Sequence, residues 1–544
     1  MMSKLIIQSN HPVLAFACEE WNRLLKLSGR AATMPTDEVW VGTWEELKNG
    51  QPELLGVDEW RDSGFSDEFV IYETENKIVL SGKSERAALY AVYQYAQEAW
   101  GLHTVYPSST SSTSNMKQHY PVDSKPAREK IRWYAPRMER RGFVFETINE
   151  PHYLKEMIDW FGHNKINEMF FTFSLWNQVG EEIAPELIKR GIQVTLGGHS
   201  MKFFLNKKEY EDLNAEADHP YTAKSQLNFK DSTWQTLFLQ DITAYCHTVP
   251  NLTRISLWPE DIADRQTEGF LEYYVQFTEK LKASLCQSGL DVEVEHIAYN
   301  AGLAWNMLER SEVKPSTEVD TLYAFWGRDY RYGYDNSPHE SDRRAKEALE
   351  DWAHRLKSTE RKLTIFEYYS DHFMLTNLFP FLPQRILKDI AYYEKQNLLG
   401  MVNLVVPYRG ADPYPWKWVH GFNSYVFCKA LWSDQMEEIL SDYYSCYPES
   451  ERAAVQALFE VIEAKLPCIT SWNALLFPAR VVDPEEADAS KEQREMILAT
   501  LEDIGSSIQS ILQRSGLNPD LEPYRYAQHI LNYTDILKQR WLEQ

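Results

Sequence analysis

Residues 363–406, LTIFEYYSDHFMLTNLFPFLPQRILKDIAYYEKQNLLGMVNLVV, contain two short apolar runs with a helical pattern between them. The runs Leu363–Tyr368 and Met401–Val406 are mostly apolar, as expected of parallel strands that are buried on both faces. In Arg385–Gln396 the apolar side chains recur at helical spacing. The segment therefore predicts one strand–helix–strand unit of a parallel sheet.

The same unit repeats along residues 138–432. Six further apolar runs precede the two already named: Arg141–Glu146, Met169–Phe173, Gln193–Gly197, Arg254–Trp258, Val292–Ala298 and Thr321–Trp326. Helical patterns separate them, among them Trp234–Thr248, Phe270–Gln287 and Asp342–Lys357. Eight such units in about 295 residues predict a TIM-type (β/α)8 barrel. An open doubly wound sheet is the alternative, but no GxGxxG or GxxxxGK(S/T) follows any run, which removes its commonest nucleotide-binding explanation.

Two further regions flank the predicted barrel. Before it, strand and helix patterns alternate, including a strand at Glu38–Thr43, a hairpin at Phe69–Ser81 and a helix at Glu85–Trp100. After it, only helical spacing is found. We therefore expect a small α/β domain in residues 1–130, a catalytic barrel in residues 131–432 and a helical domain in residues 433–544.

The composition argues against several classes of function. The chain has 80 acidic and 56 basic side chains, a net charge of −24, and no run rich in Lys or Arg, so we expect no nucleic-acid or anionic-membrane partner. Its six cysteines show no CxxC spacing and no Cys/His cluster, so we expect no zinc site, no disulfide framework and no cofactor. The start of the chain lacks a signal-peptide core, and no apolar stretch reaches about 18 residues, which predicts a cytoplasmic protein. The oligomeric state stays open.

Chemistry in TIM barrels comes from the carboxyl-terminal ends of the strands and the loops that follow them. Carboxylates, amides, a histidine and aromatic rings occur at these positions: Glu146, Trp176-Asn177, Gly198-His199, Glu260-Asp261, Tyr299-Asn300, Trp326-Gly327-Arg328, Glu367-Tyr368 and Tyr408-Arg409. Such side chains are typical of a site that binds and cleaves an oligosaccharide. We therefore expect a glycoside hydrolase.

Glu260 and Asp261 are the strongest catalytic candidates. Glycosidic cleavage needs one carboxylic acid that protonates the leaving oxygen and a second group that attacks or stabilises the oxocarbenium-like centre. Adjacent side chains on a strand point to opposite faces, so both acids serve one site only if the strand has ended, and Pro259 favours such an ending. The alternative is that Asp261 or Asp264 caps the next helix, and the residue types leave both possibilities open.

Glu367 is the third catalytic candidate, because it interrupts an apolar run where the barrel rim is expected. A buried carboxylate is costly unless it is paired or functional, and a structural role requires a partner such as Arg328. Paired with Glu260, it would be the nucleophile of a two-carboxylate mechanism.

Eight residues are expected to bind the substrate. His199 follows two glycines that allow a close approach of the backbone, and metal binding is not expected of a lone histidine. The full set is His199, Trp176, Asn300, Tyr299, Trp326, Arg328, Tyr368 and Tyr408, and each aromatic ring in it is as compatible with packing as with sugar stacking.

Several longer stretches resemble known families. IVLSGKSERAALYAVYQYAQEAWGLHTVYP (78–107) resembles the end of the small α/β domain of β-hexosaminidases and α-glucuronidases, and RMERRGFVF (137–145) resembles the first barrel strand of such enzymes. GGHSMKFFL (197–205), DHPYTAKSQLNF (218–229), ISLWPEDIAD (255–264), EYYSDH (367–372) and NSYVFCKALW (423–432) are similar to a bacterial family formerly catalogued as a domain of unknown function. That family includes endo-β-N-acetylglucosaminidases.

The resemblance covers most of residues 60–445. It implies a retaining, substrate-assisted mechanism on β-N-acetylglucosaminides, and it places the family's catalytic Asp at Asp261 beside Glu260, its Gly-His histidine at His199 and its strand-7 Glu at Glu367. Hexosaminidases have an Asp-Glu order where this chain has Glu260-Asp261, so the roles within the pair stay open. Many relatives also carry cysteine-rich loops and are exported, and this chain has neither feature.

Two alternatives to a hexosaminidase stay open. An α-glucuronidase-like or other exo-glycosidase would need a basic residue at the rim, for which Arg328, Arg331 and Arg409 are available. A catalytically silent carbohydrate-binding barrel is the other possibility, since a fold does not imply a function. The sugar, the linkage and exo or endo action are not indicated.

Overall fold

The computed structural model shows a closed barrel of eight parallel strands, as predicted. It describes residues 4–6, 10–29, 38–50, 63–105, 116–118, 130–215, 227–260, 269–300, 305–310, 313–371, 378–396, 398–406, 421–470 and 491–542. The barrel strands are β8 (Arg140–Phe145), β9 (Glu168–Thr172), β10 (Gln193–Gly198), β11 (Leu252–Leu257), β12 (Glu293–Tyr299), β13 (Asp320–Ala324), β14 (Leu363–Asp371) and β15 (Gly400–Val406). β15 pairs with β8 and closes the barrel.

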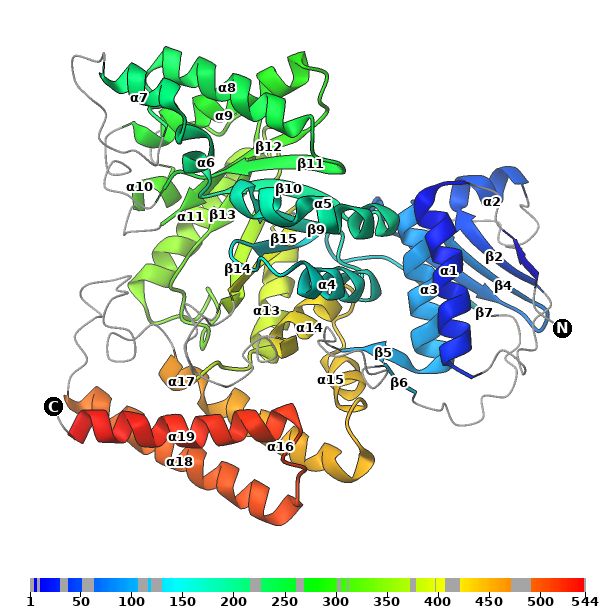
Figure 1. The fold of residues 1–544 in the computed structure, drawn as a ribbon. Coiled ribbons are helices and arrows are strands. Elements are labelled where there is room, and N and C mark those ends of the chain that lie inside the picture. The colour runs from blue at the N-terminus through cyan, green and yellow to red at the C-terminus, as the bar shows by residue number, and fades with distance from the viewer. Residues whose placement is uncertain are drawn as a thin grey trace.

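Helices surround the strands on the outside of the barrel (Figure 1). The longer ones are α4 (Pro151–His163), α5 (Phe173–Arg190), α8 (Ser232–Cys246), α9 (Phe270–Gln287), α11 (Glu340–Leu356), α13 (Pro383–Glu394) and α14 (Gly421–Ala430). Three shorter helices, α6 (Met201–Leu205), α7 (Lys208–Ala215) and α10 (Trp305–Leu308), lie in the connections after β10 and β12. The apolar runs of the strands are explained by this arrangement, because each strand is buried both inside the barrel and under the helices.

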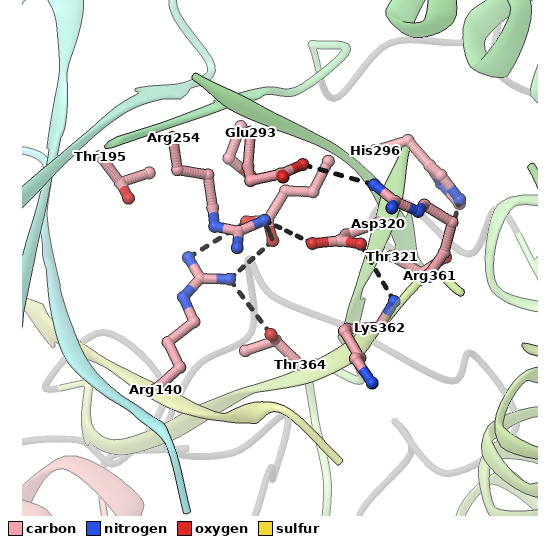
Figure 2. A network of polar contacts seen from close by, with 12 residues as sticks. Arg140, Thr195, Arg254, Glu293, His296, Asp320, Thr321, Arg361, Lys362 and Thr364 are labelled. Carbon is pink, nitrogen blue, oxygen red and sulfur yellow. Dashed lines mark hydrogen bonds and ion pairs between the residues drawn. The ribbon is translucent and has the colours of Figure 1, made fainter. Parts of the chain in front are cut away.

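An ionic layer fills the amino-terminal end of the barrel (Figure 2). The Arg140 guanidinium donates to Glu168 at 2.7 Å and to Glu295 at 2.6 Å, and Arg254 donates to Asp320 at 2.8 Å. These side chains come from five different strands and meet inside the barrel. Side chains along a strand alternate between its two faces. The inward-pointing residues of the ionic layer therefore also show which later residues of the same strands point inward.

The small domain contains a five-stranded sheet in the order β1-β2-β4-β3-β7. Its strands are β1 (Lys4–Ile6), β2 (Glu38–Thr43), β3 (Phe69–Glu73), β4 (Lys77–Gly82) and β7 (Lys130–Tyr134), with helices α1 (Pro12–Leu27), α2 (Trp44–Gly50) and α3 (Glu85–Trp100). A short pair, β5 (Leu102–Thr104) with β6 (Met116–Gln118), follows α3. β7 is antiparallel to β3, so the sheet extends beyond the boundary that we expected at residue 130. The sequence of β7, KIRWY, alternates charged and apolar residues, which suits an edge strand and hides it in a search for apolar runs.

Asp67 joins the small domain to the barrel. Its carboxylate is fully buried and accepts hydrogen bonds from Arg86 at 3.0 Å, from Asn167 at 3.0 Å and from Arg141 of β8. Arg86 and Arg141 hold the pKa of this carboxyl below its usual value, against the effect of burial. Helices α4 and α5 lie between the barrel and the small domain (Figure 1).

The carboxyl-terminal region is helical, as predicted. It contains α15 (Met436–Tyr444), α16 (Glu449–Lys465), α17 (Pro467–Thr470), α18 (Lys491–Ser515) and α19 (Glu522–Leu542). The ring of Phe381, in the connection that follows β14, lies 4.5 Å from that of Phe459 on α16 and 5.7 Å from that of Tyr526 on α19. These helices therefore support a connection from the carboxyl-terminal end of the barrel. No helix in the described parts of the chain combines the length and apolarity needed to cross a membrane.

Candidate functional site

Glu260 follows β11 at the carboxyl-terminal end of the barrel. The strand ends at Leu257, and Trp258 then fills the interior, its ring 5.2 Å from Phe170 and 5.3 Å from Phe366. Glu260 itself is half-buried. The condition for two adjacent acids to serve one site, that the strand has ended before them, is met for Glu260.

Asp261 and Asp264 lie outside the described residues. The first helix described after them, α9, begins at Phe270 and has Gly269 as its N-cap residue. Neither aspartate therefore occupies the N-cap position of α9.

His199 holds the backbone that leads into Glu260. Its Nδ1 atom lies 2.7 Å from the carbonyl oxygen of Pro259, and because a carbonyl oxygen only accepts, the imidazole is the donor. Gly198 has a φ of 69°, and a Cβ atom on Gly197 would lie 1.7 Å from the Ser256 carbonyl oxygen. The two glycines thus allow β10 to lie close to β11 and bring His199 to Pro259.

Asn300 and Trp326 form one unit. The Asn300 side chain donates to the Trp326 carbonyl at 3.0 Å and accepts from the Trp326 backbone N–H at 2.8 Å. The Trp326 indole donates to Asp371 at 3.4 Å, and its ring is half-buried. Asn300, expected to bind sugar, therefore positions Trp326, which is available as an aromatic platform.

Glu367 does not lie at the rim, which corrects our expectation for it. It pairs in register with Asn403 of β15, and its contact with Tyr393 of α13 places its side chain on the outer face of the strand. Its carboxylate accepts from Tyr330 at 2.6 Å, from Arg328 at 3.2 Å and from Tyr393 of α13. Burial raises the pKa of Glu367, and the Arg328 charge opposes this shift. The partner that a structural role required, Arg328, is thus present.

The correction follows from the length of β14. This strand continues to Asp371, three residues beyond the end that we expected at Tyr368. The carboxylate at the end of the strand is therefore Asp371, which is buried and contacts Trp326. It belongs to the EYYSDH stretch, but the apolar pattern predicts a strand end at Tyr368, before it.

Glu146 is a second rim carboxylate. It follows β8 and is half-buried, and its Oε1 atom lies 3.7 Å from the position of a Cβ atom built on Gly198. It therefore lies beside the glycines that lead to His199. The sequence predicts its position at a strand end, but no neighbouring residue in the sequence indicates a catalytic role for it.

The other expected substrate ligands are distributed differently. Trp176 lies in the first turn of α5, is buried and packs on Phe171 of β9 with their ring centroids 5.4 Å apart. Arg328 is buried and donates to Asp389 at 2.8 Å, so it is not a free rim cation. Tyr299 lies beside His199, with 6.2 Å between ring centroids. Tyr408 lies outside the described residues, and Tyr368 is on the inner face of β14.

One group of three possible metal ligands occurs in the described parts of the chain, at Glu20, Asp159 and His163. It lies between α1 and α4, away from the barrel rim. Arg23 contacts Glu20 at 2.6 Å and Arg190 contacts Asp159 at 2.5 Å, so these acids already have positive partners. The donor set does not fit a cation.

Comparisons with known proteins give matches in structure but not in sequence. No protein-family model matches the chain, and no curated protein matches its sequence. Solved structures do. A protein described as a GH138 enzyme targeting pectin rhamnogalacturonan II superposes with a TM-score of 0.61 at 12% identity, over 98% of this chain and 68% of its own.

Two GH84 structures are also similar. CpGH84B has a TM-score of 0.55 at 11% identity, over 100% of this chain and 89% of its own. CpGH84D has a TM-score of 0.51 at 13% identity, over 98% and 83%. The protein therefore has a fold that glycoside hydrolases use, which supports the broader part of the resemblance found in the sequence.

Proposed function

We propose that the protein is a glycoside hydrolase that cleaves β-N-acetylglucosaminide-type oligosaccharides with retention, using Glu260 and Asp261 as its catalytic pair. The observation that carries the proposal is the position of Glu260, half-buried directly after β11 with the preceding carbonyl held by His199. Catalytic residues of TIM-barrel enzymes come from this end of the strands. The glycoside hydrolases among the structural neighbours support the same class of reaction.

In the proposed mechanism the Glu260 carboxyl protonates the glycosidic oxygen as its bond to C1 breaks. The carbonyl oxygen of the substrate's acetamido group forms the new bond to C1, and Asp261 orients that group and balances its positive charge. Water then attacks C1 and breaks the bond between C1 and the acetamido oxygen, while Glu260 takes a proton from this water. Because C1 is attacked twice from opposite sides, the product keeps the anomeric configuration. The converse assignment exchanges the two acids, and the variants below distinguish the two.

The orientation of Glu367 favours substrate assistance over attack by the enzyme. Because Glu367 faces α13, it is not placed to attack an anomeric carbon at the rim. Among the described residues, Asp371 and Glu146 are rim carboxylates that remain for a two-carboxylate mechanism, and Asp371→Asn tests the first of them.

A uronide substrate has less support. Of the basic residues considered for it, Arg328 is paired with Asp389, and Arg331 donates to Asp329 at 2.8 Å. Arg409 lies outside the described residues. An acetamido sugar needs no such cation.

The test is a panel of chromogenic glycosides with the wild type and the Glu260→Gln and Asp261→Asn variants. We expect hydrolysis of N-acetylglucosaminides, and a loss of about 10²–10⁴-fold in each variant. The fall in activity that follows removal of the general acid should be smaller for substrates with a good leaving group. The variant that shows this dependence therefore identifies which of the two residues is the general acid. Glu347→Gln, the same change at an exposed position on α11, is the matched control and should be fully active.

Three results would contradict the proposal. Full activity in both variants would exclude the pair, and hydrolysis of uronides alone would replace the substrate class. Binding of sugars without any turnover would identify a silent barrel.

A further inference from the structure

Tyr368 carries a buried hydroxyl that has no hydrogen-bond partner in the part of the chain that the structure describes. The side chain is only 2% exposed. Its ring lies 4.8 Å from that of Phe366, which packs on Trp258 inside the barrel. Thr364, two residues earlier on the same face, reaches the ionic layer at Arg140. Tyr368 therefore points into the barrel, toward its carboxyl-terminal end.

The backbone of Tyr368 has a hydrogen-bond partner, in contrast to its hydroxyl. The Tyr368 N–H donates to the Tyr330 hydroxyl at 3.2 Å, and that hydroxyl donates in turn to Glu367 at 2.6 Å. These contacts lie on the outer side of β14, which faces the helices, and they stabilise the position of the strand from that side. The hydroxyl on the inner side has no such structural use, and a phenylalanine would fill the same space without leaving a polar atom unsatisfied.

Burial and the nearby charged groups determine which kind of hydrogen-bond partner the hydroxyl can bind. Burial raises the pKa of Tyr368 well above its usual value, so the group keeps its proton and acts as a donor. Asp371 and Glu367 are the acidic groups that act on it, and Glu367 is already paired with Arg328. A negatively charged acceptor would be repelled by the Asp371 carboxylate, whereas a neutral oxygen would not.

We infer that the Tyr368 hydroxyl is a specificity determinant, which donates a hydrogen bond to a neutral oxygen of the bound sugar, a hydroxyl or an amide carbonyl. The substrate would then be a neutral glycoside rather than a uronide. This inference rests on the proposed function and goes beyond it, because it assigns the recognition to the hydroxyl rather than to the ring face.

Tyr368→Phe is the test, since it removes one oxygen atom only. We expect kcat/KM for the neutral substrate to fall roughly 10- to 100-fold, because a site built to bind a polar group discriminates strongly when that contact is lost. The melting temperature should stay the same or rise, because the free protein loses an unsatisfied polar atom.

Tyr425→Phe is the matched control. Tyr425 lies on α14 outside the barrel, is fully buried, and its hydroxyl likewise has no partner among the described residues. Its variant should show the same effect on the melting temperature with kcat and KM unchanged. A fall in activity confined to Tyr368→Phe separates recognition from packing.

Monodeoxy analogues of the substrate identify the atom that is bound. If the hydroxyl donates to one sugar oxygen, the analogue that lacks this oxygen should bind the wild type and Tyr368→Phe equally, whereas the other analogues keep the difference. Quenching of tryptophan fluorescence gives the dissociation constants independently of turnover.

Unchanged kcat/KM and affinity in Tyr368→Phe would overturn this inference and leave the proposed function intact. A preference of the wild type for uronides would overturn it as well. A wild type that neither binds nor cleaves any glycoside of the panel would overturn both, so the two failures are distinguishable.

Discussion

The Nδ1 atom of His199 lies 2.7 Å from the carbonyl oxygen of Pro259, and the residue after Pro259 is Glu260. The contact joins the ends of β10 and β11 across the barrel rim. It sets the direction in which the chain enters Glu260, and we therefore assign His199 a positioning role for the proposed acid.

Variants of His199 can separate its two nitrogen atoms. The side-chain N–H of His199→Asn lies near the position of Nδ1 and can still donate to Pro259, whereas His199→Gln places its amide near Nε2. We expect His199→Asn to keep most of its kcat, and His199→Gln to lose about 10- to 100-fold in kcat with little change in KM, because a small misplacement of a catalytic group has effects of this size. Equal losses in both variants, with a raised KM, would show that the ring binds the substrate directly.

Glu367 and Asp371 should respond differently to loss of charge. Glu367→Gln is expected to keep kcat/KM within about threefold of the wild type and to lower the melting temperature, because its contacts are with Arg328, Tyr330 and α13. Asp371→Asn should lower kcat/KM and leave stability nearly unchanged, since it lies beside Trp326 at the end of β14. Steady-state kinetics with thermal melts of both variants check this, and the opposite pattern would restore Glu367 to the active site.

The ionic layer at the amino-terminal end of the barrel should be important for stability. Arg140→Met leaves Glu168 buried without its ion-pair partner and leaves Glu295 with only the longer contact to Arg254 at 3.5 Å, which is expected to lower the free energy of unfolding by about 3–5 kcal/mol. Arg344→Met removes a partly exposed ion pair with Glu309 and should cost less than about 1 kcal/mol. Urea denaturation measures both, and similar losses would contradict the buried character of the layer.

His296 should make stability depend on pH. Burial lowers the pKa of His296 from 6.5 to about 4 in the folded protein, so the unfolded chain binds the proton first. The stabilisation is complete above pH 6.5 and is lost as the pH falls toward 4, by about 3 kcal/mol in total at about 1.4 kcal/mol per pH unit.

His296→Leu is expected to flatten the slope of unfolding free energy between pH 7 and pH 5, whatever its effect on stability at pH 7. The change should be partial, because burial also lowers the pKa of His163 to about 4. The exposed His354 is the control, and His354→Gln should keep the slope of the wild type. An unchanged slope in His296→Leu would show that this ring does not carry the expected proton linkage.

The barrel could be predicted from the sequence because its strands are buried on both sides. Each strand is a short apolar run bounded by polar segments, and all eight begin within two residues of the expected positions. The small sheet was predicted less completely. β7 was missed, since an edge strand has one exposed side and no continuous apolar run.

The same double burial explains what could not be predicted at the site. In a strand that is apolar on both faces, the pattern does not tell which residues point inward, so Glu367 and Tyr368 could not be assigned to opposite sides of β14. The contact of Asn300 with Trp326 could not be predicted either, because it depends on the pairing of β12 with β13. Glu260 and His199 could be proposed as candidates because proline and glycine mark the ends of their strands.

Asp67 has a consequence for any shortened version of the protein. The Arg141 guanidinium in β8 is completely enclosed, and this aspartate from the amino-terminal region is its acidic partner. Expression of the barrel from residue 131 onward would leave that cation in the interior with backbone carbonyl groups and the Trp432 ring around it, but without its carboxylate partner. We therefore expect the barrel to need the preceding region for its stability, and a truncation for crystallisation or engineering should begin ahead of Asp67.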